Sequence, residues 1–202
     1  MQALDQLDDV TYDMPLFKGE HATIWPRPVQ RPIPYWGAAI SEASFTRYGK
    51  LGWPILTLPA NQPPELLKAQ LDTYRRVYHE HGHDPARRRI GLTLFTYVAE
   101  DAAEAHETFE RGMAHYFGFL HSITTNAEAA QHHVYNSLPT SARLSGSPAQ
   151  VVTRLHDLIR YFDVTDIVNM TQFRGYLTHQ QVLRSIRLFA ERVMPAFSPV
   201  TM

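Results

Sequence analysis

The chain has no cysteine among its 202 residues. This absence excludes disulfide bonds, a cysteine nucleophile and zinc sites built from thiolates. Any redox chemistry of the protein must therefore come from a bound cofactor. The apolar content of 44% is ordinary for a globular protein, so the chain is able to bury a sizeable core.

The sequence also lacks an excess of charge of either sign and a long apolar run. Its 19 basic and 20 acidic residues give a net charge of -1, so no long-range field favours nucleic acid or an anionic membrane. No stretch of about 18 apolar residues is present, and the acidic start, residues 1–5, has neither the basic nor the apolar part of a leader peptide. We expect a cytoplasmic protein that takes a small ligand, with neither nucleic acid nor a membrane as partner.

The first 33 residues are rich in proline. Proline removes a backbone donor and pushes the preceding residue out of helical geometry, and several prolines fall between positions 15 and 34. We predict an irregular, proline-rich lead-in over residues 1–33, followed by one domain over residues 34–202.

From residue 34 onward, strand-like and helix-like segments alternate. Short apolar runs predict four strands, at residues 35–40, 54–58, 90–98 and 166–170. Caps and helical periodicity predict the intervening helices, at residues 41–51, 63–82, from 101 onward, 147–162 and 178–194. Strands that are apolar on both faces and alternate with helices are typical of a parallel sheet with the helices packed outside.

Two segments of this pattern carry further expectations. A polar and weakly patterned stretch at about 124–144 predicts a long loop or insertion. In the last helix, steps of three and four residues predict that four apolar side chains face inward: Val182, Ile186, Phe189 and Val193.

His79, His81 and His83 alternate near the end of a predicted helix. They lack the i, i+4 spacing that directs two imidazoles at one metal ion. We interpret them as a solvated helix end and predict no metal site.

Five segments of the chain resemble the bacterial-luciferase-like monooxygenases, in the order in which they occur in the C-terminal half of that family. They are residues 19–21 (GEH), 26–32 (PRPVQRP, leading to the Ser-Glu-Ala-Ser helix start), 51–56 (LGWPIL), 146–148 (GSP) and 184–195 (RSIRLFAERVMP). The resemblance implies a (β/α) barrel of the TIM type. Because such a barrel needs eight strands and about 250 residues, we predict a partial barrel: about four parallel strands with outer helices, corresponding to the family's last four.

The resemblance further implies a flavin-dependent oxidoreductase of the monooxygenase type that acts on a small organic substrate. Reduced FMN is the implied cofactor, and a deazaflavin is the alternative. The family's usual active-site histidine belongs to the half of the barrel that the resemblance does not cover. No catalytic residue is therefore assigned.

Candidate cofactor-binding residues follow the predicted strands. Ser41 and Ser44 lie at the start of a helix, where free N–H groups and the helix dipole favour a phosphate, and the resemblance places the flavin phosphate at this corner. The negative charge of Glu42 would repel a dianion there, and a plain N-cap without a ligand is the alternative explanation for Ser41, which the sequence slightly favours. Thr57 and Asn169 fall near strand ends, where ligands of such barrels bind, although polar residues are also common there simply because the chain leaves the core. Met170 is a candidate for an apolar pocket wall or for ordinary core.

A sheet of about four strands has open edges and an uncovered apolar face. We expect the chain to form a homodimer, or to pair with another barrel half or a full-length monooxygenase. Three functional hypotheses stay open: an oxidoreductase whose site is completed by another subunit, a non-catalytic flavin-binding or accessory protein derived from the family, and a chain without independent function.

Overall fold

The computed structural model describes residues 10–23, 25–26, 29–30, 33–124 and 142–197. Backbone contacts divide the chain into two compact units, Met1–Trp36 and Gly37–Met202. The division falls three residues after the predicted end of the lead-in. Each unit is described by itself.

The first unit contains a β-hairpin, so the prediction of an irregular lead-in was wrong for this segment. Strand β1 (Val10–Met14) pairs antiparallel with β2 (Phe17–Ala22). Gly19 lies opposite Tyr12, whose ring occupies the space that a Cβ at position 19 would need. The prolines did not prevent these strands, because Pro15 lies in the connection between them and the other prolines follow β2.

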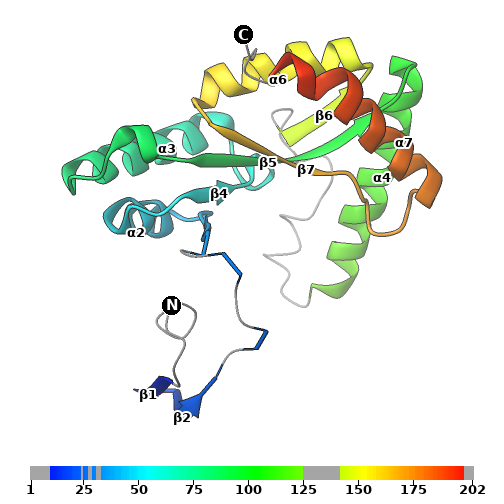
Figure 1. Ribbon diagram of the computed structural model, residues 1–202. Coiled ribbons are helices and arrows are strands. Elements are labelled where there is room, and N and C mark those ends of the chain that lie inside the picture. Colours follow the sequence, from blue (N-terminus) through cyan, green and yellow to red (C-terminus); the bar gives the residue numbers. More distant parts are fainter. Residues whose placement is uncertain (1–9, 24, 27–28, 31–32, 125–141, 198–202) are drawn as a thin grey trace. The chain divides into compact units, whose positions relative to one another are not determined.

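The second unit is built on a five-stranded sheet in which every pairing is parallel. Four of its strands are the predicted ones: β3 (Gly37–Ala38), β4 (Ile55–Thr57), β5 (Ile90–Val98) and β7 (Asp166–Met170). Each of these pairs with the one that precedes it in this series, β3 with β4, β4 with β5 and β5 with β7. This is the neighbour relation of a (β/α) barrel, and Figure 1 shows β4, β5 and β7 next to one another.

The fifth strand, β6 (Arg143–Gly146), begins inside the segment at about 124–144 that the sequence predicts to be a loop, so that prediction is wrong at its end. It pairs with Phe95–Val98, past the point at which β4 ends opposite Leu92. The remaining residues of the predicted loop, 125–141, lie outside the described residues. Strand β6 is therefore an addition to the far end of β5 and not a member of the barrel series.

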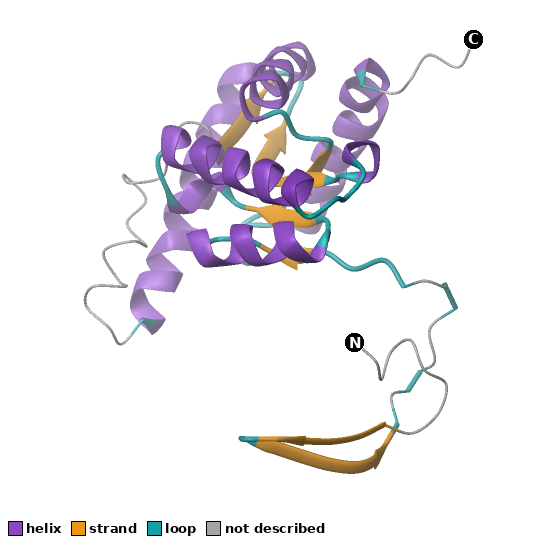
Figure 2. Ribbon diagram, turned by 90° about the vertical axis from the view of Figure 1, so that its left-hand side faces the viewer, coloured by secondary structure: helices purple, strands orange, loops and turns teal. Residues whose placement is uncertain are grey.

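Three helices cover one face of the sheet: α2 (Glu42–Leu51), α3 (Pro64–Glu80) and α6 (Pro148–Phe162). Helices α2 and α3 lie side by side, as Figure 2 shows in front of the strands. The three helices pack on Ile55 and on the even-numbered residues of β5. Phe45 of α2, Leu71 of α3 and Leu155 of α6 are fully or almost fully buried there. This outer face matches the prediction of a parallel sheet with helices packed outside.

Helix α4 (Ala102–Ile123) begins at Asp101, as predicted, where Oδ1 accepts a 2.7 Å hydrogen bond from the backbone N–H of Glu104. Unlike α2, α3 and α6, helix α4 packs on the opposite face, against the odd-numbered residues Phe95 and Tyr97. Phe109 of α4 and Phe173 complete this second cluster with their rings edge to face, 5.6 Å apart. The face that would line a complete barrel is thus partly covered by the chain's own helix.

The C-terminal helical segment differs in part from the prediction. Helix α7 (His179–Leu188) continues as a π-helix over Phe189–Val193 and a short 3-10 helix over Met194–Ala196. Ser185 is buried and accepts a 2.8 Å hydrogen bond from the backbone N–H of Val98. Ile186 is 43% exposed, so its predicted inward orientation was wrong; the residue next to it turns inward because it satisfies a strand N–H group. Across the described residues, no helix is both long and apolar enough to cross a membrane.

Candidate functional site

The carboxyl ends of β3, β4, β5 and β7 form the edge of the sheet where a parallel (β/α) fold binds its ligands. All predicted site residues lie on or directly after these strands. Their side chains nevertheless lie on different faces of the sheet.

Ser41 is the N-cap of α2 and has extended backbone geometry. The side chain of Ser44, one turn into the helix, forms hydrogen bonds with the backbone of Ile40 and Ser41. Its Oγ accepts from the backbone N–H of Ile40 at 3.1 Å and of Ser41 at 3.0 Å, and donates to the carbonyl of Ser41 at 2.6 Å. The Ser44 hydroxyl is therefore committed to holding the corner. The exposed hydroxyl of Ser41 donates to Ser44 Oγ at 3.3 Å, and its own oxygen faces solvent at the helix start.

The same helix start lines a shallow hollow of about 880 Å³ that runs along the exposed side of α2. Its lining includes Ser41 and Glu42 at one end and Arg47 and Lys50 farther along the helix. The first N–H groups of a helix have no acceptor inside it. The hydroxyl of Ser41 and these N–H groups suit an anion at the helix start, and Arg47 and Lys50 add positive charge to the hollow farther along the helix. Sequence reasoning missed Arg47 and Lys50, although their three-residue spacing on one helix face was a readable signal.

Thr57 is 2% exposed, and its hydroxyl has no hydrogen-bond partner within the part of the chain that the structure describes. It pairs in register with Leu92, which belongs to the outer core with Ile55. Because paired residues of a sheet share a face, Thr57 points toward the helix-covered face rather than toward the barrel interior.

Asn169 also lies on the outer face. It is in register with Leu94 of the outer core, and its Oδ1 accepts a 3.0 Å hydrogen bond from the Thr96 hydroxyl. Its side chain lines a cavity between β7, α6 and the C-terminal segment. Asn169 and Thr57 are thus separated by the sheet from the face on which a barrel-type cofactor would lie.

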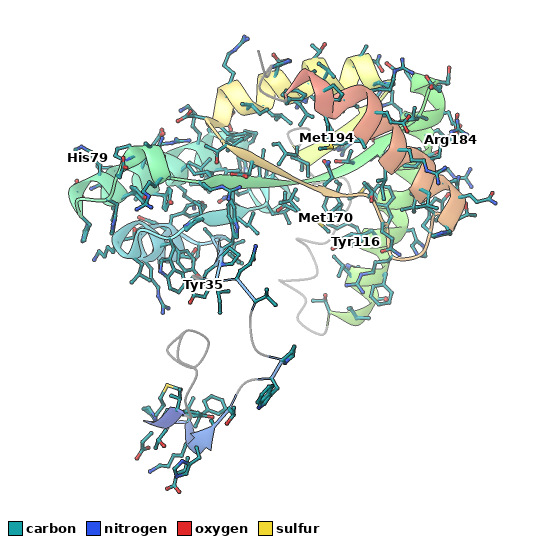
Figure 3. The ribbon with its side chains drawn as sticks, in the orientation of Figure 1. Tyr35, His79, Tyr116, Met170, Arg184 and Met194 are labelled. Carbon is teal, nitrogen blue, oxygen red and sulfur yellow. The ribbon has the colours of Figure 1, made fainter. Side chains whose placement is uncertain are left out.

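Met170 is the one predicted residue on the opposite face, in register with Phe95. It packs against the second cluster beside Tyr116 of α4, and Figure 3 labels both side chains. Farther along, the guanidinium of Arg174 lies over two α4 rings, 5.6 Å from the centroid of Tyr116 and 4.5 Å from that of Phe119. Met170 therefore belongs to an apolar surface formed with α4, and the guanidinium of Arg174 lies next to that surface.

Acid–base groups with shifted pKa values are distributed away from the carboxyl ends, with one exception. Burial, reinforced by Glu104, raises the pKa of Tyr97, which points into the second cluster. Asp166 and Arg89 pair at the amino ends of β7 and β5. There, burial raises the pKa of Asp166, but hydrogen bonds from Arg89 and Thr165 prevail and lower it. The described residues contain no group of three or more metal-ligating side chains.

Comparison with known proteins shows which family has this arrangement of strands and helices. Residues 1–164 match the family model of luciferase-like monooxygenases. The segment 184–195, which also resembles that family in sequence, lies beyond this match. No curated protein matched the chain.

Solved structures share the fold. A monooxygenase, RslO1, from Streptomyces bottropensis superposes with a TM-score of 0.71 at 21% identity, covering 98% of this chain and 58% of its own. The coenzyme F420 dependent tetrahydromethanopterin reductase of Methanopyrus kandleri gives 0.68 at 17% identity, covering 98% and 60%. The oxygenating constituent of 3,6-diketocamphane monooxygenase from Pseudomonas putida, a complex with FMN, gives 0.59 at 17% identity, covering 79% and 47%.

The chain therefore spans about three fifths of the length of the first two of these structures, as expected for an arc of a barrel. The likeness extends over the barrel series β3, β4, β5 and β7, and the family match covers most of the chain. On these grounds, the chain belongs to the luciferase-like monooxygenase family.

Proposed function

We propose that this chain binds a flavin-type cofactor at the carboxyl end of its sheet and serves a flavin-dependent oxidoreductase reaction on a small organic substrate, in a site completed by another subunit. The observation that carries the proposal is the start of α2, where the exposed Ser41 and the first N–H groups of the helix meet at one end of a hollow; Arg47 and Lys50 line the same hollow farther along the helix. Such a group of donors and cations fits the phosphate that FMN and deazaflavin cofactors share. The bound cofactor would supply the redox chemistry, which the cysteine-free chain cannot supply itself.

The residues of this chain would bind and orient the cofactor. Ser41 and the first N–H groups of α2 would hold the phosphate, while Ser44 keeps the corner in shape through its three backbone hydrogen bonds. Met170 would contribute an apolar wall beside the cofactor. Thr57 and Asn169 are not part of this proposal, because they lie on the helix-covered face.

A second candidate is a flavin-binding protein without catalysis of its own. It is favoured by the residues of the proposed site, Ser41, Arg47, Lys50 and Met170, because these side chains can bind a cofactor but none of them is assigned a catalytic role. Similarity to the structure named Flavoprotein 390, with a TM-score of 0.59 at 16% identity, fits either candidate. It covers 80% of this chain and 66% of its own.

The decisive experiment is an absorption spectrum of the purified protein together with its mass in solution. We expect a bound chromophore with a flavin or deazaflavin spectrum and a mass above that of a 23.2 kDa monomer. A colourless protein that takes up neither FMN nor a deazaflavin on titration would refute the proposal. If cofactor binds but substrate oxidation is absent with reduced cofactor and oxygen, the second candidate is supported.

The phosphate contact has its own test. The double variant Arg47→Gln/Lys50→Gln removes the positive charge along this hollow and should weaken FMN binding about two- to fivefold, in the range of exposed charge pairs. Lys68→Gln/Arg76→Gln removes two exposed cations from α3 and should leave binding unchanged. Equal effects of the two double variants would show a general charge effect and not a phosphate site. Oligomeric state and cytoplasmic location stay predictions.

A further inference from the structure

We infer that the cavity between α6, β7 and the C-terminal helical segment is a second ligand site, for a small, neutral, largely apolar molecule with one hydrogen-bond acceptor. The cavity has a volume of about 300 Å³. It lies on the outer face of the sheet, apart from the proposed cofactor site. Its existence is therefore independent of the proposed function.

The walls of the cavity are apolar and come from three elements. Helix α6 contributes Leu155 and Ile159, one turn apart, and β7 contributes Ile167. The C-terminal segment closes the other side with three large side chains: Phe189, Met194 and Phe197. At roughly 30 Å³ for each water molecule of liquid volume, the space suits a molecule of about ten heavy atoms, at the lower end of ligand pockets.

One polar group inside this apolar lining can orient a ligand. The Oδ1 of Asn169 is occupied by the Thr96 hydroxyl at 3.0 Å, whereas the Nδ2 of Asn169 has no acceptor among the described residues. An amide with its oxygen fixed holds its N–H groups in a defined direction. Because these groups donate, the ligand must bring an acceptor such as a carbonyl oxygen.

The charge of the ligand follows from the lining. Thr165 is the other polar lining residue, and its hydroxyl donates to the carboxylate of Asp166 at 2.7 Å. No charged side chain lines the cavity among the described residues. An ion would lose its hydration without gaining a counter-charge, so a ketone, aldehyde or ester fits and a carboxylate does not.

The backbone beside the cavity is irregular. Helix α7 passes into a π-helix over Phe189–Val193, directly before Met194. Short π-helical turns are rare and occur frequently at functional sites, because they widen a helix and redirect its side chains. Here the π-helical turn spans the residues between two of the cavity's walls, Phe189 and Met194.

The test uses 2-octanone as the probe and octanoate as its charged counterpart, followed through the side-chain methyl signals of the full chain. We expect 2-octanone to shift the methyl signals of Ile159, Ile167 and Met194 in a saturable manner, and octanoate to leave them in place. Asn169→Leu should weaken binding of 2-octanone about five- to tenfold, the worth of one hydrogen bond. Saturable shifts with octanoate as well would overturn the assignment of a neutral ligand.

Two filling variants separate a site from a packing gap. Ile159→Trp, or Met194→Trp at the 52% exposed rim position if the first does not fold, should abolish the shifts. Ile186→Trp, at a 43% exposed position of α7 outside the cavity, should retain them. Failure of 2-octanone to shift the lining methyls of the wild-type chain, or equal shifts in the filled variants, would overturn the inference, whatever the flavin spectrum shows.

Discussion

The hydroxyl of Thr96 on β5 donates a 3.0 Å hydrogen bond to the amide oxygen of Asn169 on β7. Thr96 is fully buried, and its hydroxyl also lies 3.2 Å from the carbonyl of Leu94. The pair joins two strands of the barrel series on the helix-covered face. It also fixes the direction in which the Asn169 amide faces the cavity.

Thr96→Val keeps the shape of the side chain and removes this hydrogen bond. We expect a loss of about 1 kcal/mol in the free energy of unfolding, because the half-buried amide oxygen of Asn169 loses its donor. Chemical denaturation measures it. Thr93→Val is the control on the same strand, because Thr93 makes no hydrogen bond through its hydroxyl among the described residues and should tolerate the change. Equal losses in both variants would contradict the role of the pair.

Ser41 and Ser44 have different roles at the same corner. Ser44→Ala removes the acceptor of two backbone N–H groups, so we expect a loss of about 1–2 kcal/mol in stability, as for a lost cap. Ser41→Ala should cost less in stability and should weaken binding of FMN but not of riboflavin, which lacks the phosphate. Thermal unfolding and fluorescence titration measure the two effects. If Ser41→Ala changes only the melting temperature, Ser41 is a plain cap.

Gly112 and Gly118 offer a matched pair within α4. A Cβ at position 112 would lie 2.5 Å from Cδ2 of Phe173, whereas a Cβ at position 118 meets no atom within 4 Å. We expect Gly112→Ala to cost about 1–3 kcal/mol through overpacking. Gly118→Ala should stabilise the helix by up to about 1 kcal/mol, since alanine is the better helix former. The midpoints of denaturant-induced unfolding measure both effects. If Gly112→Ala leaves the stability unchanged, α4 does not pack against Phe173 as described.

The carboxylate of Asp166 predicts a pH-dependent contribution to stability. Its pKa is lowered in the folded chain, so its contribution is present above the ordinary aspartate value of about 3.9 and is lost as the pH falls through the lowered value. Asp166→Asn should destabilise the chain by about 0.5–1 kcal/mol at neutral pH, in the range of exposed and half-buried ion pairs. The difference from the wild type should shrink below about pH 4.

Denaturation at several pH values between 3 and 7 measures this effect. Glu107→Gln is the control, because Glu107 is 73% exposed and pairs with Arg111 only at 3.6 Å. It should stay within about 0.5 kcal/mol of the wild type at every pH. A constant difference between Asp166→Asn and the wild type down to pH 3 would contradict the lowered pKa.

The sequence by itself determined the family and the order of the four barrel-series strands with their helices. Local signals were sufficient for this: Ser41 and Gly52 at the ends of α2, Ser147 and Pro148 at the start of α6, and the apolar run of β5. These features act within a few residues, through backbone geometry and caps. The hairpin and β6 were not predicted, because short strands with polar residues carry no apolar run. Whether such strands form depends on their pairing partners.

Only the tertiary structure decided which way the side chains of the site point. Strand β5 is buried on both faces, so its sequence lacks the alternation of apolar and polar residues that would distinguish the faces. The placement of Asn169 and Thr57 on the outer face, of Met170 on the other, and of α4 over the inner face depends on strand register. Register is set by the pairing of distant segments, and a shift of one residue would exchange the two faces.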